Sequence, residues 1–263
     1  MKLQTIRHWR IVSMTAVLLC LFMGAAWRLG TGSLSAVGWE SLYLICPLGY
    51  LETAAASKSL VLGAAIPFMI ILVLTILVGR VFCGWVCPVP LTRKLLINEL
   101  DDKPEPKTRP DAKGPLAVLG LTIGSAAVFG FPVFCLICPI GLTMGVLLAF
   151  IRLVGSNEPS WDLLLFPAVL VIELVLLHRW CSKICPVGAL LSLFSRWQLF
   201  LVPKVNRKQC IEGRGGTCGQ CTAACPAAID LRHKPDKGIL SECTKCQECS
   251  ARCPVQAIKF TRR

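Results

Sequence analysis

Long apolar runs separated by shorter basic segments are the dominant pattern along the 263-residue chain. Four of these runs approach the roughly 20 residues that a helix needs to cross a bilayer. We therefore predict an α-helical membrane protein with four transmembrane helices, at residues 11–27, 60–78, 116–134 and 161–177. A fifth run, residues 140–154, is shorter and contains Arg152, so we expect a re-entrant or interfacial helix there.

Basic residues gather in segment 79–115 and after His178, whereas the alternate connections hold few of them. Positive charge marks the cytoplasmic side of a membrane protein. The distribution therefore predicts a multi-pass protein of the cell inner (cytoplasmic) membrane, with both termini and the C-terminal domain in the cytoplasm. It also accounts for the formal charge of +13 without a nucleic-acid partner, which we do not expect.

Two short cysteine motifs occur twice, in the same order. LICPLG at residues 44–49 recurs as LICPIG at 136–141, and FCGWVCPV at 82–89 recurs as WCSKICPV at 180–187. This order predicts an internal repeat, about residues 11–92 and 116–192, that forms two related helical hairpins. We accordingly expect a membrane domain at residues 1–200 and a separate domain at residues 205–263.

Eight cysteines determine the chemistry of the C-terminal domain. Its second group has C-x2-C-x2-C-x3-C-P spacing, in which three thiolates hold one [4Fe-4S] cluster and the fourth reaches the other cluster. We therefore predict an α+β ferredoxin domain with two [4Fe-4S] clusters. The alternative is a pair of zinc sites, but zinc ribbons lack the interleaved cysteine and the proline after it. The predicted ligands are Cys210, Cys218, Cys221 and Cys253 for the first cluster, and Cys243, Cys246, Cys249 and Cys225 for the second.

The first cysteine group departs from the usual spacing. Seven residues, IEGRGGT, separate Cys210 from Cys218, where the ferredoxin pattern has about two. Glycines at 213, 215 and 216 give this loop the conformational freedom to absorb the insertion.

Two C-x3-C-P pairs follow the second and fourth predicted spans. Residues four apart share one face of a helix, so Cys83 pairs with Cys87 and Cys181 with Cys185. Two such dithiols facing each other would supply the four thiolates of a further iron–sulfur cluster. The alternatives are inert thiols at a helix end and a zinc site.

Spans that carry FCGWVCP and WCSKICPVGAL, followed by a two-cluster tail, resemble the NapH/MauN type of membrane ferredoxin. The resemblance covers nearly the whole chain. It implies four spans, cytoplasmic clusters, and electron exchange between the quinone pool and a partner iron–sulfur protein or cytochrome. Related membrane polyferredoxins act as regulators or assembly factors, so the motif does not specify the partner.

Four further residues are candidates outside these motifs. Cys46 and Cys138, with Cys135 nearby, occupy the repeated CP-x-G turns and depart from the resemblance. A disulfide, an additional metal site and simple packing are the alternatives for them. Glu173 lies inside the fourth predicted span, where it is a candidate proton acceptor from quinol or a partner for a basic residue.

Together these features predict a membrane-bound electron-transfer subunit, of the quinol dehydrogenase type, that passes electrons between quinol and a partner redox protein. Basic residues near the ligands favour an acidic partner. The alternative is a redox regulator or metal-enzyme assembly factor without turnover.

Overall fold

The structure, a computed structural model, describes most of the chain. The described residues are 3–26, 36–39, 42–60, 62–87, 89, 113–131, 134, 138–156, 161–176, 184–233 and 237–262. Cys135 and Cys181, two of the predicted site residues, lie outside these ranges.

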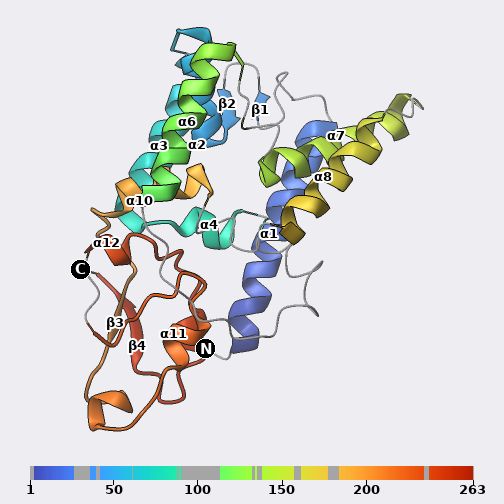
Figure 1. Cartoon of the computed structure of the whole chain (residues 1–263). Helices are drawn as coiled ribbons and strands as arrows, with labels where there is room; N and C mark the ends of the chain where they lie inside the picture. The colour runs from blue at the N-terminus through green and yellow to red at the C-terminus, as the bar shows by residue number, and fades with distance from the viewer. Residues whose placement is uncertain are drawn as a thin grey trace.

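Helices dominate the first two thirds of the chain (Figure 1). Helices α2 and α10 both begin at a proline that follows a cysteine, because proline has the helical φ angle and needs no hydrogen bond at the first position. The elements are α1 (Leu3–Ala26), β1 (Ala36–Trp39), β2 (Leu42–Ile45), α2 (Pro47–Ser57), α3 (Leu62–Val78), α4 (Val81–Trp85), α6 (Lys113–Phe129), α7 (Pro139–Ser156), α8 (Asp162–Leu176) and α10 (Pro186–Ser195).

The prediction of four transmembrane helices in two hairpins is wrong. Within the described residues, no helix is both long and apolar enough to cross a membrane. Helices α3 and α6 have 17 residues each and α8 has 15, which gives them lengths of about 23 to 26 Å, less than the roughly 30 Å of a bilayer core. The apolar runs do form helices, but left-handed glycines at 79 and 130 follow α3 and α6 directly. The fifth run forms α7, which contains Arg152.

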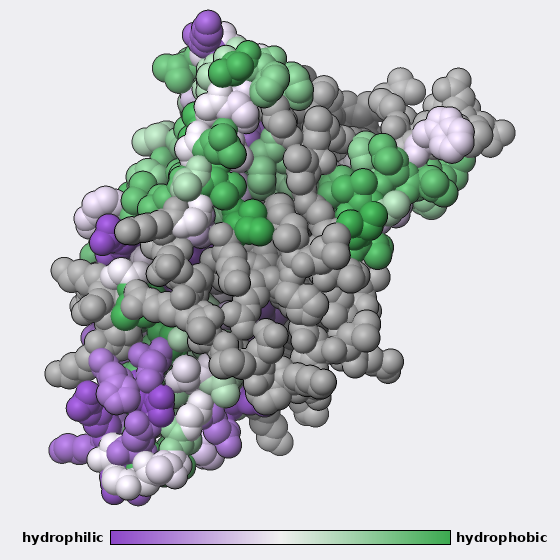
Figure 2. All heavy atoms as spheres, viewed as in Figure 1, coloured by the Kyte–Doolittle hydropathy of each residue, from purple (hydrophilic) through white to green (hydrophobic). Residues whose placement is uncertain are grey.

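Two groups of helices make up this part of the molecule. Helices α2, α3, α6 and α10 pack together, and α7 packs against α8 and α1 (Figure 1). The core of the first group includes Leu48, Leu119, Val187 and Leu191. Large apolar side chains also remain exposed, and the space-filling view shows them above a hydrophilic C-terminal module (Figure 2).

Segments related by the predicted repeat have equivalent neighbours. Helix α2 packs on α6, and its counterpart α7 packs on α1. Helices α3 and α8 each carry an internal proline, Pro67 and Pro167. Cys185 packs in the cluster that contains Ile71 of α3, whereas Cys87 packs with Leu170 of α8. Each C-x3-C-P motif therefore contacts the helix of the other half.

The C-terminal module is a small α+β unit. Its antiparallel pair sets Val205 opposite Ile258, which brings the two ends of the module together. Ile229, Leu231, Cys249 and Ile258 form its small buried core. The elements are β3 (Val202–Val205), the 3-10 helix η2 (Glu212–Arg214), α11 (Gln220–Ala224), α12 (Lys237–Leu240), α13 (Glu248–Ala251) and β4 (Ile258–Thr261).

This module is docked on α4 through the loop that carries its second cysteine group. The Trp85 indole N–H donates to the Lys245 carbonyl at 3.1 Å. Arg10 of α1 donates to the Gly84 carbonyl at 3.1 Å and to Glu248 Oε1 at 3.2 Å. The backbone at Gly84 lies so close to the Thr244 carbonyl that a Cβ there would clash with it. The loop and α4 are therefore in direct backbone contact.

Adding one methyl group at this contact should loosen the docking. We expect Gly84→Ala to lower the free energy of unfolding by about 1–3 kcal/mol, the usual cost of overpacking. Gly120→Ala is the control, because nothing lies within 4 Å of a Cβ at that position of α6. This control should gain about 0.5–1 kcal/mol from helix propensity. Denaturant titration followed by circular dichroism measures both, and equal stability of the two variants would contradict the contact.

Candidate functional site

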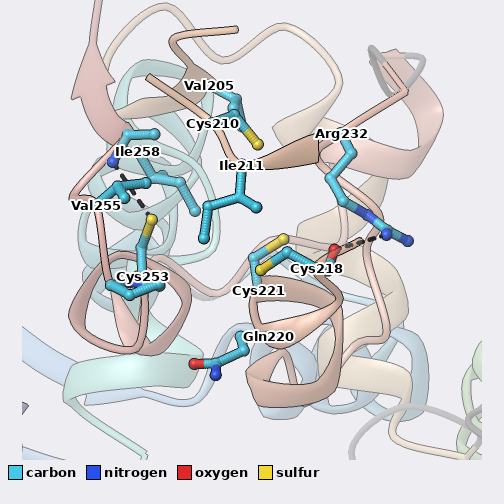
Figure 3. Close-up of a pocket in the computed structure, with 12 residues that line it drawn as sticks. Val205, Cys210, Ile211, Cys218, Gln220, Cys221, Arg232, Cys253, Val255 and Ile258 are labelled. Atoms are coloured by element: carbon cyan, nitrogen blue, oxygen red, sulfur yellow. Dashed lines mark hydrogen bonds between the residues drawn. The ribbon is translucent and has the colours of Figure 1, made fainter. Parts of the chain in front are cut away.

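Four of the predicted ligands line one pocket of the C-terminal module: Cys210, Cys218, Cys221 and Cys253. Figure 3 shows Cys218 and Cys221 side by side, with Cys253 on the opposite side of the pocket. Cys221 belongs to α11, whereas Cys253 lies between α13 and β4 and is distant in sequence. The structure thus brings together the four cysteines that the sequence assigns to the first cluster.

The other four cysteines, Cys225, Cys243, Cys246 and Cys249, line a second pocket. Cys246 and Cys249 are buried, whereas every cysteine of the first pocket is partly exposed. With their open mouths included, the two pockets hold similar space, about 380 Å³ and 370 Å³. Each pocket takes three cysteines from one group and the fourth from the other, which is the interleaving of two-cluster ferredoxins. This donor set fits two [4Fe-4S] clusters.

A site for a single metal ion would need at least three ligand side chains to converge on one position. In the part of the chain that the structure describes, no three His, Cys, Asp or Glu side chains converge on one position for a metal ion. A cubane instead spreads its thiolates around a four-iron core.

Burial raises the pKa of several ligand thiols. The pKa of Cys225 rises to about 11, mainly because burial penalises the thiolate, although backbone N–H groups of Ile229 and Ala227 oppose the shift. The pKa of Cys249 is also raised, first by burial and then by the neighbouring thiols. Because a bound cluster needs thiolates, its insertion must displace these protons. Cluster insertion should therefore become easier as pH rises.

Arg232 fixes the loop that carries the seven-residue insertion. Its guanidinium donates to Glu212 Oε2 at 2.6 Å and to the Cys218 carbonyl at 2.9 Å. It also bonds both carboxylate oxygens of Asp230 at 2.9 and 2.8 Å, and these bonds hold the pKa of Asp230 well below its usual range. Since Glu212 lies between Cys210 and Cys218, the network sets the spacing of these two ligands.

Glycines make the folded insertion compact. A Cβ at Gly213 would clash with the Arg207 carbonyl, and Gly215 has a left-handed φ of 88°. Both positions therefore need glycine, which explains how the long loop still delivers Cys210 to its pocket.

Two buried cations lie beside the second pocket, and the sequence analysis missed both. Lys245 is 1% exposed and Arg80 is 8% exposed. In the described residues, neither Lys245 Nζ nor Arg80 Nε has a hydrogen-bond partner. Burial raises the pKa of Cys243, and the charges of Lys245 and Arg80 oppose that rise. Lys245 stands within a C-x2-C motif and Arg80 precedes the C-x3-C-P motif of Cys83, but only the fold shows that both side chains are buried.

The cysteines of the helical part are distributed over two apolar clusters. Cys138 is buried in the main core, and Cys46, Cys83 and Cys185 pack against that core. Cys87 packs elsewhere, with Val89 and Leu170. The structure thus brings Cys83 and Cys185 to one core but places Cys87 outside it.

Cys46 and Cys185 each cap a helix, and their surroundings differ. Burial raises the pKa of Cys46, and Glu52 and Cys83 add to the rise. Cys185 Sγ instead accepts a hydrogen bond from the Gly188 N–H at 3.4 Å. Glu173 lies in α8, and its side chain is outside the described part.

A family model described as a 4Fe-4S binding domain matches residues 60–98 and 161–208. The matched segments contain both C-x3-C-P motifs and end before Cys210. The match therefore concerns the helical part and supports iron–sulfur chemistry independently of the ferredoxin spacing.

Relatives cover most of the chain. The ferredoxin-type protein NapH of Haemophilus influenzae is 26% identical over 97% of this chain and 89% of its own length. NapH of Escherichia coli is 29% identical over 90% of this chain and 81% of its own. The methylamine utilization ferredoxin-type protein MauN of Paracoccus denitrificans is 28% identical over 73% of this chain and 63% of its own. The chain is thus similar to the NapH and MauN ferredoxin-type proteins over most of its length.

These matches confirm the resemblance seen in the motifs and support an iron–sulfur electron-transfer protein. No solved structure matches the chain.

Removing the Arg232 guanidinium should free the loop between Cys210 and Cys218. We expect Arg232→Gln to lose the first cluster selectively, which would lower the iron content of the full chain by about four atoms. Iron analysis and the EPR spectrum of the reduced protein measure this loss. Lys259→Gln, an exposed change on β4, is the control. An Arg232→Gln protein with full iron content would show that the network does not hold the ligands.

Proposed function

We propose that the protein passes electrons between the quinone pool and a partner redox protein. The observation that carries the proposal is the pair of four-cysteine pockets, one docked on the helical part and the other partly exposed. When bound, each cluster would accept or give up one electron. A quinol releases two electrons and two protons on oxidation, so two such centres match one quinol.

The helical part offers a surface suited to an apolar electron donor. Large apolar side chains are exposed along α3 and α8, among them Leu62 at 78% and Leu164 at 71%. Such faces favour a lipid-soluble quinol over a water-soluble carrier. Location at the cell inner membrane, where quinols reside, is part of the proposal. No described helix is proposed to span it.

The partner is expected to be an acidic iron–sulfur protein or cytochrome. Several basic side chains are exposed on the module that holds the partly exposed first pocket, and five of them are expected to contact the partner. Complementary charge speeds the encounter of redox partners and orients them. The residues are Arg207, Lys208, Arg214, Arg252 and Lys259.

Anaerobic EPR spectroscopy of the purified full-length protein tests this function. We expect addition of a quinol analogue to generate the signals of reduced [4Fe-4S] clusters, because the proposed pathway connects quinol to the module. Dithionite is the control, since it reduces the clusters without any quinol site. Clusters that respond to dithionite but never to quinol, at any poise of the quinone pool, would favour a regulator or assembly factor.

The C-x3-C-P cysteines are proposed to form a further redox site on this pathway, Cys83, Cys87, Cys181 and Cys185 acting together. The 4Fe-4S family model that matches both motifs supports this proposal. We expect Cys87→Ser and Cys185→Ser each to abolish quinol-dependent reduction of the module, while dithionite still reduces it.

Cys20→Ser is the matched control, because Cys20 is an exposed cysteine of α1. Reduction kinetics by EPR and the iron content of the full chain are measured for all three variants. If Cys87→Ser and Cys185→Ser both keep the wild-type rate and iron content, these cysteines only pack the helices.

A further inference from the structure

The two pockets differ in the charges that surround them. Beside the second pocket, Arg80 lies between α3 and α4, and Lys245 lies within the ligand loop between Cys243 and Cys246. The Lys245 stem packs against Gly79, where a Cβ would lie 2.8 Å from Lys245 Cε. Both cations therefore lie near the contact between the helical part and the module, and both oppose the rise in the pKa of Cys243.

No carboxylate bonds to Lys245 Nζ or to Arg80 Nε in the described residues. Glu248, the acid of the same ligand loop, is paired with Arg10 instead. A buried cation is costly when no carboxylate bonds to it, and burial accordingly lowers the pKa of Lys245. A [4Fe-4S] cluster with four thiolates is net negative, so it would supply a countercharge that the described residues do not place on these two nitrogens.

At the first pocket, the cation that lines the pocket, Arg232, is already compensated. Arg232 is paired with Glu212 at 2.6 Å and with Asp230 at 2.8 Å. The effects of Arg232 and Asp230 on Cys221 have opposite signs. All three side chains are partly exposed, so solvent weakens their influence further. The first pocket therefore has no net buried positive charge from this trio.

We propose that Arg80 and Lys245 raise the reduction potential of the second cluster above that of the first, so that a single electron in the module resides on the second cluster. Reduction adds one negative charge to a cluster. Nearby buried cations stabilise that added charge, and net charge is one of the determinants of cluster potential. This inference rests on the proposed function only in taking both pockets as [4Fe-4S] sites.

The order of the two reduction potentials matters because of where the second cluster lies. Its ligand loop is the part of the module that touches α4. The higher-potential centre would therefore face the helical part, where quinol is proposed to react. An electron arriving from that side is held at the second cluster until a second electron or the partner moves it onward.

A mediated redox titration of the full-length protein, followed by EPR, tests the order of potentials without any quinol. A Cys218→Ser variant, altered only in the first pocket, assigns each signal to its cluster. We expect the second cluster to titrate above the first in the wild-type protein. Failure of quinol to reduce the protein would not affect this measurement, so the two proposals can fail separately.

Neutral variants test the two cations. Arg80→Gln and Lys245→Met should each lower the ratio of reduced to oxidised second cluster at least tenfold at a fixed potential. This corresponds to a fall of about 59 mV in the reduction potential of that cluster. The first cluster should not change. Arg80→Lys keeps the charge and should stay near wild type, and Lys204→Gln, an exposed change on β3, is the surface control.

A wild-type second cluster that titrates at or below the first would overturn the proposal. So would wild-type potentials in both neutral variants with full iron content. If a neutral variant loses iron, the order of potentials in the wild-type protein decides the question.

Discussion

The structure depends on one contact, the docking of the Cys243–Cys249 loop on α4. The backbone at Gly84 meets the Thr244 carbonyl, and Trp85 donates to the carbonyl of Lys245. Four of the predicted cluster ligands line the second pocket, and three of them lie in this loop. The loop predicted to wrap one cluster is thus also the surface that joins the module to the helices. Its conformation is constrained from both sides.

That constraint explains the unusual polarity of the contact. Lys245 and Arg80 are buried at it without a carboxylate on their free nitrogens, within the described residues. The thiols of Cys225 and Cys249 line the second pocket, and burial raises the pKa of each, although Cys225 keeps some exposure. A buried cation without a carboxylate is unfavourable, whereas burial favours the neutral, protonated form of a thiol. A bound cluster would need these thiols as thiolates, and its negative charge would then lie beside the two cations.

The first pocket is held together by different interactions. Its ligands are partly exposed, and the loop that carries Cys210 is fixed by polar bonds of Arg232 rather than by docking. A balanced ion network suits a site near solvent, where charge costs little. The two halves of a duplicated ligand pattern have therefore acquired contrasting environments. Such a difference in exposure and surrounding charge lets two clusters of the same type differ in reduction potential.

The cysteine spacing by itself determined which four thiols gather in each pocket, because interleaved C-x2-C and C-x3-C-P segments have few ways to surround two cubanes. The motifs also revealed the relationship to NapH and MauN. Apolar runs located the helices, with α3 starting two residues after its predicted start and ending where expected. Hydrophobicity did not determine whether these helices cross a membrane, since no described helix is both long and apolar enough to do so.

Only the tertiary structure decided which residues far apart in sequence act on one another. Arg80, Arg10 and Glu248 looked like ordinary charged residues until α1, α4 and the ligand loop met. The role of Arg232 likewise follows only from its hydrogen bonds to Glu212 and to the Cys218 carbonyl. The C-x3-C spacing paired Cys83 with Cys87, yet packing placed them in different apolar clusters. Spacing along the chain fixes local neighbours, whereas burial and charge compensation depend on contacts between distant segments.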